Sequence, residues 1–295
     1  MIDVRLRQRL FRQEGVVATW QMVGDGMTPG AIRHFVRGLR ELHDGVWLTG
    51  FAPVTRRQLW WAAALSAPGT LLAGPSAGAA FGFRPWDRDY EVVLRRGSGG
   101  TRRQGGLLVH RSSVIVDGDA GWLGDLPITS PERTVLDLAA LQSWRRTRKC
   151  VREAVRLRRT TMARLHERLM RTPGRRGTAD LRRYLVAYAL LPFEDCRSDA
   201  EAMALEVLHG AGEPIPEVNA IVAGEEADLS WPARRVIVEL DGPDFHRFKE
   251  EDARKTAVWR AARWDVRREP TTVVFDRPEQ FLATVRRSYV DPLQP

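Results

Sequence analysis

The chain has 295 residues, 43% of them hydrophobic, so it is long enough for two domains and can bury an ordinary core. Its formal net charge of +9 at pH 7 favours a polyanionic partner and argues against an acidic, disordered chain. Arginine supplies all but three of the 46 basic residues. A GC-rich genome explains most of that choice, although the guanidinium group also suits phosphate because it can donate to two oxygens at once.

The cysteine content and the apolar runs limit where the protein can act. Two cysteines, Cys150 and Cys196, give neither a disulfide framework nor a four-ligand zinc site, so a reducing cytoplasm is the expected compartment. The first residues lack the apolar run of a signal peptide. The longest apolar run, residues 59–72, is interrupted by polar and helix-breaking residues. We therefore expect a cytoplasmic protein without a membrane partner.

The pattern along the chain divides it into four segments. Residues 1–50 predict a small helical unit that ends in a hairpin, and residues 51–133 predict a mixed α+β middle domain. Residues 134–196 predict an Arg-rich helical connector. Residues 197–295 return to alternating strands and helices, after a break at Leu191-Pro192 where proline restricts helix continuation. The expected fold class is therefore a multi-domain α/β protein.

The first segment has the order helix, helix, turn, basic helix, hairpin. Helices are expected over residues 4–13 and 17–23, and Thr28-Pro29 supplies an N-cap followed by proline at the first helical position. Apolar residues then recur at helical spacing as far as Leu39, and residues 42–48 predict a strand–turn–strand. This order is typical of a winged helix-turn-helix, which places its basic helix in the major groove. The side chains expected to contact DNA are Arg33, His34, Arg37 and Arg40.

A small helical bundle, whose arginines only solvate its surface, is the alternative to the winged helix-turn-helix. The first half of the chain also resembles the bacterial abortive-infection type IV antitoxin family (AbiEi-like). Three stretches carry the resemblance: Gly45-Val46-Trp47-Leu48, residues 74–80 and residues 127–139. It implies an N-terminal winged helix that binds operator DNA, and a cognate toxin protein as a partner.

The segments between the two ends carry no assigned chemistry. Ser130-Pro131 predicts a helix start, and Arg133 and Asp137 stand four residues apart and can pair. Residues 145–159 are densely basic. That run is either a solvated helix face or a surface that follows a phosphate backbone.

The last segment predicts a helix from Ser198 to about residue 209, then strands over 217–222, 226–231 and 235–241. A helix over 248–262 and strands near 264–267 and 273–275 follow. Side chains alternate along a strand, so Glu239 and Asp241 should point to one face. A hairpin at residues 231–234 would bring Asp228 beside them. Such an oxygen-rich group suits Mg²⁺ or Mn²⁺ rather than zinc.

Asp228, about ten residues, and then Glu239-x-Asp241 is similar to the motif of the PD-(D/E)xK nuclease superfamily, with Asp241 in place of the usual lysine. Residues 239–246 and the charged helix after them resemble the branch related to very-short-patch-repair endonucleases, although the zinc-binding cysteines of that branch are missing. The resemblance implies a restriction-endonuclease-like α/β/α domain with metal-dependent endonuclease activity on DNA.

Each candidate residue has an expected role in that activity. Asp228, Glu239 and Asp241 are the expected metal ligands, and Asp241 can instead orient water. His246 is the candidate base because the pKa of imidazole lies near neutrality. Glu201 either completes the metal site or caps its own helix in the pattern Ser198-x-x-Glu201. The residues expected to neutralise phosphate charge are Lys249 and Lys255.

Two alternatives to an active nuclease remain open. Asp228 and Glu239 can be edge-strand charges in contact with solvent. The chain can also be a transcriptional regulator or antitoxin that binds its own operator, with an inactive nuclease-like domain as an interaction module. Repair through recognition of a mismatch is a third function that the resemblance allows.

Overall fold

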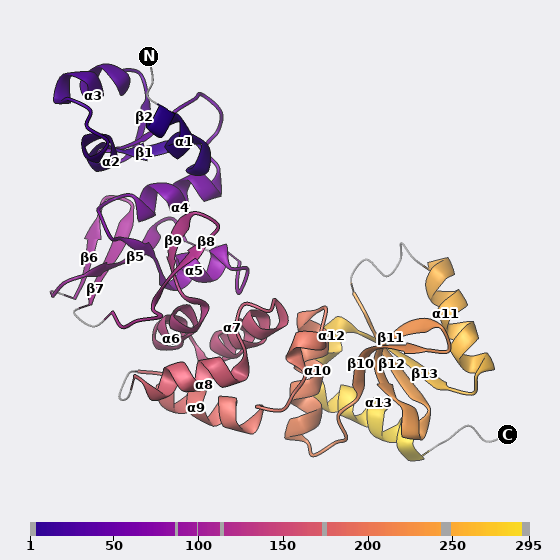
Figure 1. Cartoon of the computed structure of the whole chain (residues 1–295). Coiled ribbons are helices and arrows are strands. Elements are labelled where there is room, and N and C mark those ends of the chain that lie inside the picture. Colours follow the sequence, from indigo (N-terminus) through magenta and orange to yellow (C-terminus); the bar gives the residue numbers. More distant parts are fainter. Residues whose placement is uncertain are drawn as a thin grey trace. The chain divides into compact units, whose positions relative to one another are not determined.

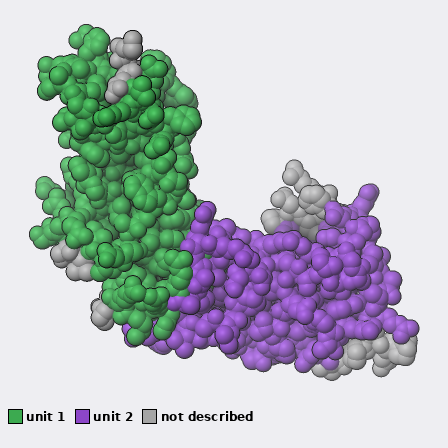
Figure 2. All heavy atoms as spheres, viewed as in Figure 1, with its two compact units in different colours: residues 1–154, 164–181 green, residues 155–163, 182–295 purple. Residues whose placement is uncertain are grey.

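A computed structural model of the chain describes residues 4–85, 88–98, 100–112, 115–172, 176–242 and 249–290. Helices alternate with the strands of three sheets, which makes it an α/β protein (Figure 1). The chain forms two compact units: unit 1 is Met1–Ala154 with Arg164–Leu181, and unit 2 is Val155–Ala163 with Arg182–Pro295 (Figure 2). Among the described residues, no helix combines the length and apolarity needed to cross a membrane.

Unit 1 begins with three helices and a small antiparallel sheet of strand order β1-β3-β2. A cluster of Leu6, Val17, Met22 and Ile32 forms its core. The Thr28 hydroxyl accepts a hydrogen bond from the Ala31 N–H, so the predicted N-cap of the third helix is confirmed. The elements are α1 (Val4–Arg12), β1 (Val16–Ala18), α2 (Thr19–Gly24), α3 (Pro29–Phe35), β2 (Arg40–His43) and β3 (Val46–Leu48).

Two details of this region differ from the sequence prediction. Val17 lies in β1 opposite Trp47 rather than in a helix, since pairing with β3 buries this β-branched side chain completely. Helix α3 stops at Phe35, and Gly38 then takes a positive φ of 82° that a continuing helix could not contain. Arg40 consequently begins strand β2 instead of extending the basic helix. The predicted hairpin after it is confirmed.

The middle of unit 1 is a six-stranded sheet of strand order β6-β7-β5-β4-β9-β8. The pairs β5–β7 and β4–β9 are parallel, and the other neighbouring strands are antiparallel. Its elements are α4 (Arg56–Ala64), β4 (Leu71–Leu72), α5 (Gly74–Ala80), β5 (Glu91–Arg96), β6 (Thr101–Gln104), β7 (Leu107–Ser112), β8 (Ala120–Leu123) and β9 (Leu126–Thr129).

Four helices follow: α6 (Pro131–Leu141), α7 (Trp144–Arg156), α8 (Met162–Met170) and α9 (Thr178–Ala187). The Ser130 hydroxyl caps α6, as predicted, by accepting the Arg133 N–H at 3.3 Å. Arg133 donates to Asp137 at 2.9 Å and to the fully buried Asp119 at 2.7 Å. Arg168 on α8 donates to Asp119 from the other side at 2.9 Å. The predicted Arg133–Asp137 pair is thus part of a buried network, whose charges compensate one another.

The basic run on α7 is not a uniformly solvated face. Arg152 is 4% exposed. Several neighbours on the same helix are exposed, so the surface part of the run is smaller than the sequence indicates.

Unit 2 is built on a four-stranded sheet of order β10-β11-β12-β13, in which only the pair β12–β13 is parallel. Helix α11 connects these two parallel strands. The elements are η1 (Phe193–Asp195), α10 (Asp199–Gly210), β10 (Glu217–Val222), β11 (Glu225–Trp231), η2 (Pro232–Arg234), β12 (Val236–Asp241), α11 (Lys249–Ala261), β13 (Asp265–Pro270), α12 (Thr271–Asp276) and α13 (Pro278–Val290).

Helices cover both faces of this sheet. On one face, Leu229 and Val238 pack in a cluster with Phe281 of α13 and with residues of α10 and α12. On the other face, Ile237 packs with Trp259 of α11. Alternation along β12 therefore divides its side chains between two cores, and Glu239 and Asp241 follow Ile237 on the α11 face.

The predicted strand at residues 273–275 is wrong, because this segment is helix α12. Val273 and Val274 are adjacent, and both are buried in the cluster that contains Phe281. Two neighbouring residues of a strand would point to opposite faces, whereas a helical turn can bury both against one layer. The other predicted helices and strands of this unit are confirmed, with ends that agree within one or two residues except in β13, which continues three residues further than predicted.

Candidate active site in unit 2

The central hairpin of unit 2 ends its regular pairing at the candidate carboxylates. Strands β11 and β12 are in register from Trp231↔Val236 to Leu229↔Val238. Beyond Leu229, carboxylate side chains instead of backbone carbonyl groups accept hydrogen bonds from the backbone N–H groups. The Asp228 N–H donates to Glu239 Oε1 at 2.9 Å, and the Leu240 N–H donates to Asp228 Oδ2 at 2.7 Å. The two carboxylates therefore lie together across two neighbouring strands, as the sequence pattern predicts.

Glu239 is buried and Asp228 is half-buried. Glu239 is 6% exposed, and burial raises its pKa to about 7, with repulsion from Asp228 as the second cause. The pKa of Asp228 is raised to about 6, mainly by burial, and the charges of Glu201 and Asp241 contribute to this increase. The bound Leu240 N–H acts in the opposite direction. Burial thus disfavours the ionised form of both groups, which a nearby positive charge or a proton would offset.

Two basic side chains lie close to the pair. Arg268 stands opposite Glu239 in the parallel pairing of β12 and β13. It donates to Asp241 through Nε at 3.1 Å and Nη2 at 2.5 Å, and its Nη2 is 3.3 Å from Asp252 Oδ1. The positive charges of Arg268 and Lys255 both lower the pKa of Glu239. The site thus combines carboxylates with a guanidinium and an ammonium group.

Asp241 shares the α11 face with Glu239, as predicted, but its two oxygens bind Arg268. Within the described residues, no three histidine, cysteine, aspartate or glutamate side chains are grouped so that they could hold a metal ion. Of the three expected ligands, Asp228 and Glu239 bind across the two strands, and Asp241 is paired with the guanidinium.

Ser198 caps α10, and the Glu201 side chain binds the Ser198 hydroxyl and the Arg197 N–H rather than the Ser198 N–H expected of a capping box. Its Oε1 accepts the Ser198 hydroxyl at 2.6 Å, while the Glu201 N–H donates back to that hydroxyl at 3.1 Å. Its Oε2 accepts the Arg197 N–H and the Asn219 side-chain amide, both at 2.7 Å. Because the charge of Glu201 raises the pKa of Asp228, Glu201 also lies near the carboxylate pair.

Of the remaining candidates of unit 2, the structure describes the side chain of Lys255 but not those of Lys249 and His246. Lys255 is half-buried on α11, and its charge acts on Glu239. Lys249 is the first residue of α11, and its side chain is outside the described part of the chain. His246, the candidate base, lies outside the described residues.

The candidate DNA-contacting residues of unit 1 are exposed. Arg33 and His34 lie on α3, Arg37 follows in the turn, and Arg40 begins β2. They therefore span a helix end and the first strand of the hairpin instead of one helical face.

The sequence prediction missed Arg268. Strand β13 carries two adjacent arginines, Arg267 and Arg268, and only the second faces α11. The pairing Glu239↔Arg268 decides which of the two reaches the site. A one-residue change of register would exchange them, and the sequence of a parallel strand contains no turn that sets its register.

No family model matches the chain, and no curated protein matches it.

Proposed function

We propose that this chain is a DNA-binding protein whose unit 2 hydrolyses phosphodiester bonds of DNA with the help of Mg²⁺ or Mn²⁺. One observation carries the proposal: Asp228 and Glu239 meet where β11 and β12 stop pairing, on the face that also holds Lys255 and Arg268. Helices on both faces of the sheet support a restriction-endonuclease-like α/β/α domain.

The carboxylate pair fits a hard divalent cation. Mg²⁺ is held by one or two protein carboxylates and keeps water or phosphate oxygens in its other positions, so two carboxylates are a sufficient protein contribution. Asp228 and Glu239 each use one oxygen for a backbone N–H, which fixes the side chain and leaves the other oxygen for a ligand. A bound ion would supply charge neutralisation at the phosphate and a more acidic water molecule.

The other residues of the site contribute position and charge. Arg268 holds Asp241 by two hydrogen bonds, so this carboxylate has a fixed direction from which it can orient a water molecule. Lys255 is the candidate phosphate ligand, because its charge acts on Glu239 from α11. Glu201 is held at three points near Asp228 and would add to the negative potential that attracts the cation.

The start of unit 1 supports DNA binding. The order α1-β1-α2-α3-β2-β3, with an antiparallel β1-β3-β2 sheet, is the order expected of a winged helix-turn-helix. The side chains that would contact phosphates and base edges are Arg33 and His34 of α3, with Arg37 and Arg40 after it.

Cleavage of supercoiled plasmid in Mg²⁺ or Mn²⁺ tests the nuclease. Glu239→Gln and Asp228→Asn keep the shape of the site and should reduce nicking on the order of 100-fold, as for loss of an electrostatic group that acts on the transition state. Glu213→Gln is the matched control, since this carboxylate pairs with Arg286 outside the site. Equal nicking by the wild type and both site variants, or none with either metal, would disprove the proposal.

A second function is favoured by the same geometry. Asp228 and Glu239 already bind backbone N–H groups, and Arg268 already occupies Asp241, so the pair can serve to join two diverging strands. The chain would then be a transcriptional regulator or antitoxin with an inactive nuclease-like domain, and a cognate toxin protein would be its partner. DNA binding that survives EDTA and Glu239→Gln, without cleavage, and that is lost in Arg33→Ala/Arg37→Ala would support this function.

A further inference from the structure

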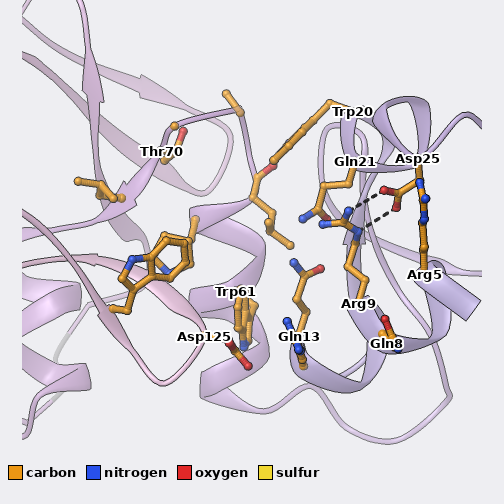
Figure 3. Close-up of a pocket in the computed structure, with 18 residues that line it drawn as sticks. Arg5, Gln8, Arg9, Gln13, Trp20, Gln21, Asp25, Trp61, Thr70 and Asp125 are labelled. Atoms are coloured by element: carbon orange, nitrogen blue, oxygen red, sulfur yellow. Dashed lines mark hydrogen bonds and ion pairs between the residues drawn. The ribbon is translucent and has the colours of Figure 1, made fainter.

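Unit 1 contains a cavity of about 630 Å³ that the nuclease proposal does not use (Figure 3). It lies between α1 and α2 on one side, and α4 with the β8–β9 hairpin on the other. Ligand pockets for small organic molecules have volumes of about 300–1,000 Å³. The space is therefore large enough for a molecule with a ring system and a side group.

Two buried polar atoms at this cavity have no hydrogen-bond partner among the described residues: Gln13 Oε1, an acceptor, and Trp61 Nε1, a donor. Gln13 is 8% exposed, and Trp61 is 1% exposed. The backbone next to Gln13 is tied to α4, because Gln58 Nε2 donates to Glu14 O at 2.9 Å, and Trp61 follows one turn later. Buried polar groups are nearly always paired. Both atoms have almost no accessible surface, so a ligand that offers a donor and an acceptor would satisfy them with a shift of these two side chains.

The walls of the cavity are aromatic. Trp20 is held in place by a hydrogen bond from its Nε1 to Leu65 O at 2.8 Å, while 39% of its surface remains exposed. Trp122 on β8 is 70% exposed and also lines the cavity. Exposed indole rings at the mouth of a pocket are stacking surfaces for flat heteroaromatic rings.

The α1 side of the cavity is basic, while Asp125 lines it from the β8–β9 hairpin. Arg5 and Arg12 of α1 line it and are exposed, and neither forms an ion pair within the described residues. Arg9 between them is already bound by Asp25, with contacts of 3.0 and 2.7 Å (Figure 3). Two arginines thus remain for an anionic group of the ligand, which phosphate matches well.

We infer that this cavity binds a nucleotide. The base would lie against the tryptophan rings and would donate to Gln13 Oε1 and accept from Trp61 Nε1, since the edge of a nucleobase carries donors beside acceptors. The phosphate would lie at Arg5 and Arg12. The nucleotide can be free or can belong to a single strand. The site is contained in unit 1, so it can exist whether or not unit 2 is a nuclease.

Calorimetric titration of the full chain in EDTA tests the inference. One arm uses free purine and pyrimidine mononucleotides, a second uses a short single-stranded oligonucleotide, and a third uses indole-3-acetate as a flat anion without a base edge. Binding of a mononucleotide assigns a free nucleotide, and binding of the oligonucleotide alone assigns a strand. Binding of indole-3-acetate alone, or of none of the three, would overturn the inference.

Matched variants test the contacts. Trp61→Phe keeps a ring but removes the donor, and Gln13→Met keeps the length but removes the acceptor. Each should weaken binding about tenfold, the effect of one buried hydrogen bond. Trp60→Phe is the control, because its indole N–H is also buried and unpaired but Trp60 does not line the cavity. Arg5→Ala/Arg12→Ala changes only the surface and should weaken a nucleotide but not its nucleoside. Unchanged affinity in Trp61→Phe, Gln13→Met and the double variant would refute the assignment.

Discussion

Removing the charge of Glu239 should make the protein more stable at alkaline pH, although it removes a candidate metal ligand. Glu239→Gln keeps a side-chain oxygen that can accept the Asp228 N–H, so the join between β11 and β12 is preserved. The variant loses a negative charge whose ionised form is disfavoured by burial and by repulsion from Asp228.

The size of the gain follows from the pKa of Glu239, which is raised from 4.5 to about 7. An acid with a raised folded-state pKa binds more protons when folded, so its contribution to stability falls as the pH rises from about 4.5 to 7 and stays low above that range. At about 1.36 kcal/mol for each pKa unit, the ionised side chain costs roughly 3 kcal/mol at alkaline pH. Glu239→Gln should recover most of that amount at about pH 8 and almost none at about pH 4.5.

Urea denaturation of the full chain at the two pH values, followed by circular dichroism, measures the difference. Glu213→Gln serves as the control for a carboxylate in a partly exposed ion pair and should change little. In the wild type, added Mg²⁺ at alkaline pH should raise the free energy of unfolding, and in Glu239→Gln this effect should be lost. A variant that is less stable than the wild type at both pH values, or equally stabilised at both, would refute the electrostatic reasoning.

Three further results are expected. In urea denaturation, Gly177→Ala should lower the free energy of unfolding by about 3 kcal/mol more than Gly224→Ala. Both glycines have a positive φ, but only at Gly177 would an added Cβ lie 2.2 Å from a backbone oxygen, that of Ala139. Equal losses in the two variants would contradict this explanation. Arg268→Met should lower the free energy of unfolding by about 3 kcal/mol, because it leaves the carboxylates of Asp241 and Asp252 without this positive charge, and Arg268→Lys should lower it less. An unchanged free energy of unfolding in Arg268→Met would show that these ion pairs do not stabilise the fold. In fluorescence anisotropy with duplex DNA, Arg33→Ala should reduce the slope of log affinity against log salt by about 1; the same change in Arg102→Ala on β6 would argue against α3 as the DNA-contacting element.

Local chemistry made some elements of this fold predictable. Thr28, Ser130 and Ser198 each stand before a helix and accept an N–H three residues later, so the sequence marks the helix starts. The hairpin between β11 and β12 was also predictable, because the short turn Pro232–Arg234 separates two strands and thereby sets their register. That register brought Asp228 beside Glu239.

Elements decided by distant contacts were not predictable in the same way. Val17 is in a strand because of its partner Trp47, and Val273 is in a helix because one core accommodates it with its neighbour. The position of Arg268 depends on parallel pairing across helix α11. Asp119 has no local signal for its two arginine partners, one of which lies 49 residues away. Non-local register and burial decide each of these cases.

The division of the chain has a consequence for how such a protein can arise and be recombined. Neither unit is one continuous stretch, since Val155–Ala163 belongs to unit 2 and Arg164–Leu181 belongs to unit 1. Arg156 and Arg158 donate to Arg197 O and Glu194 O at 2.7 and 3.2 Å, so a gene joined after residue 181 would separate these donors from their acceptors. A junction after residue 154 would remove the Arg168 that compensates Asp119. A single crossover therefore cannot exchange either unit intact.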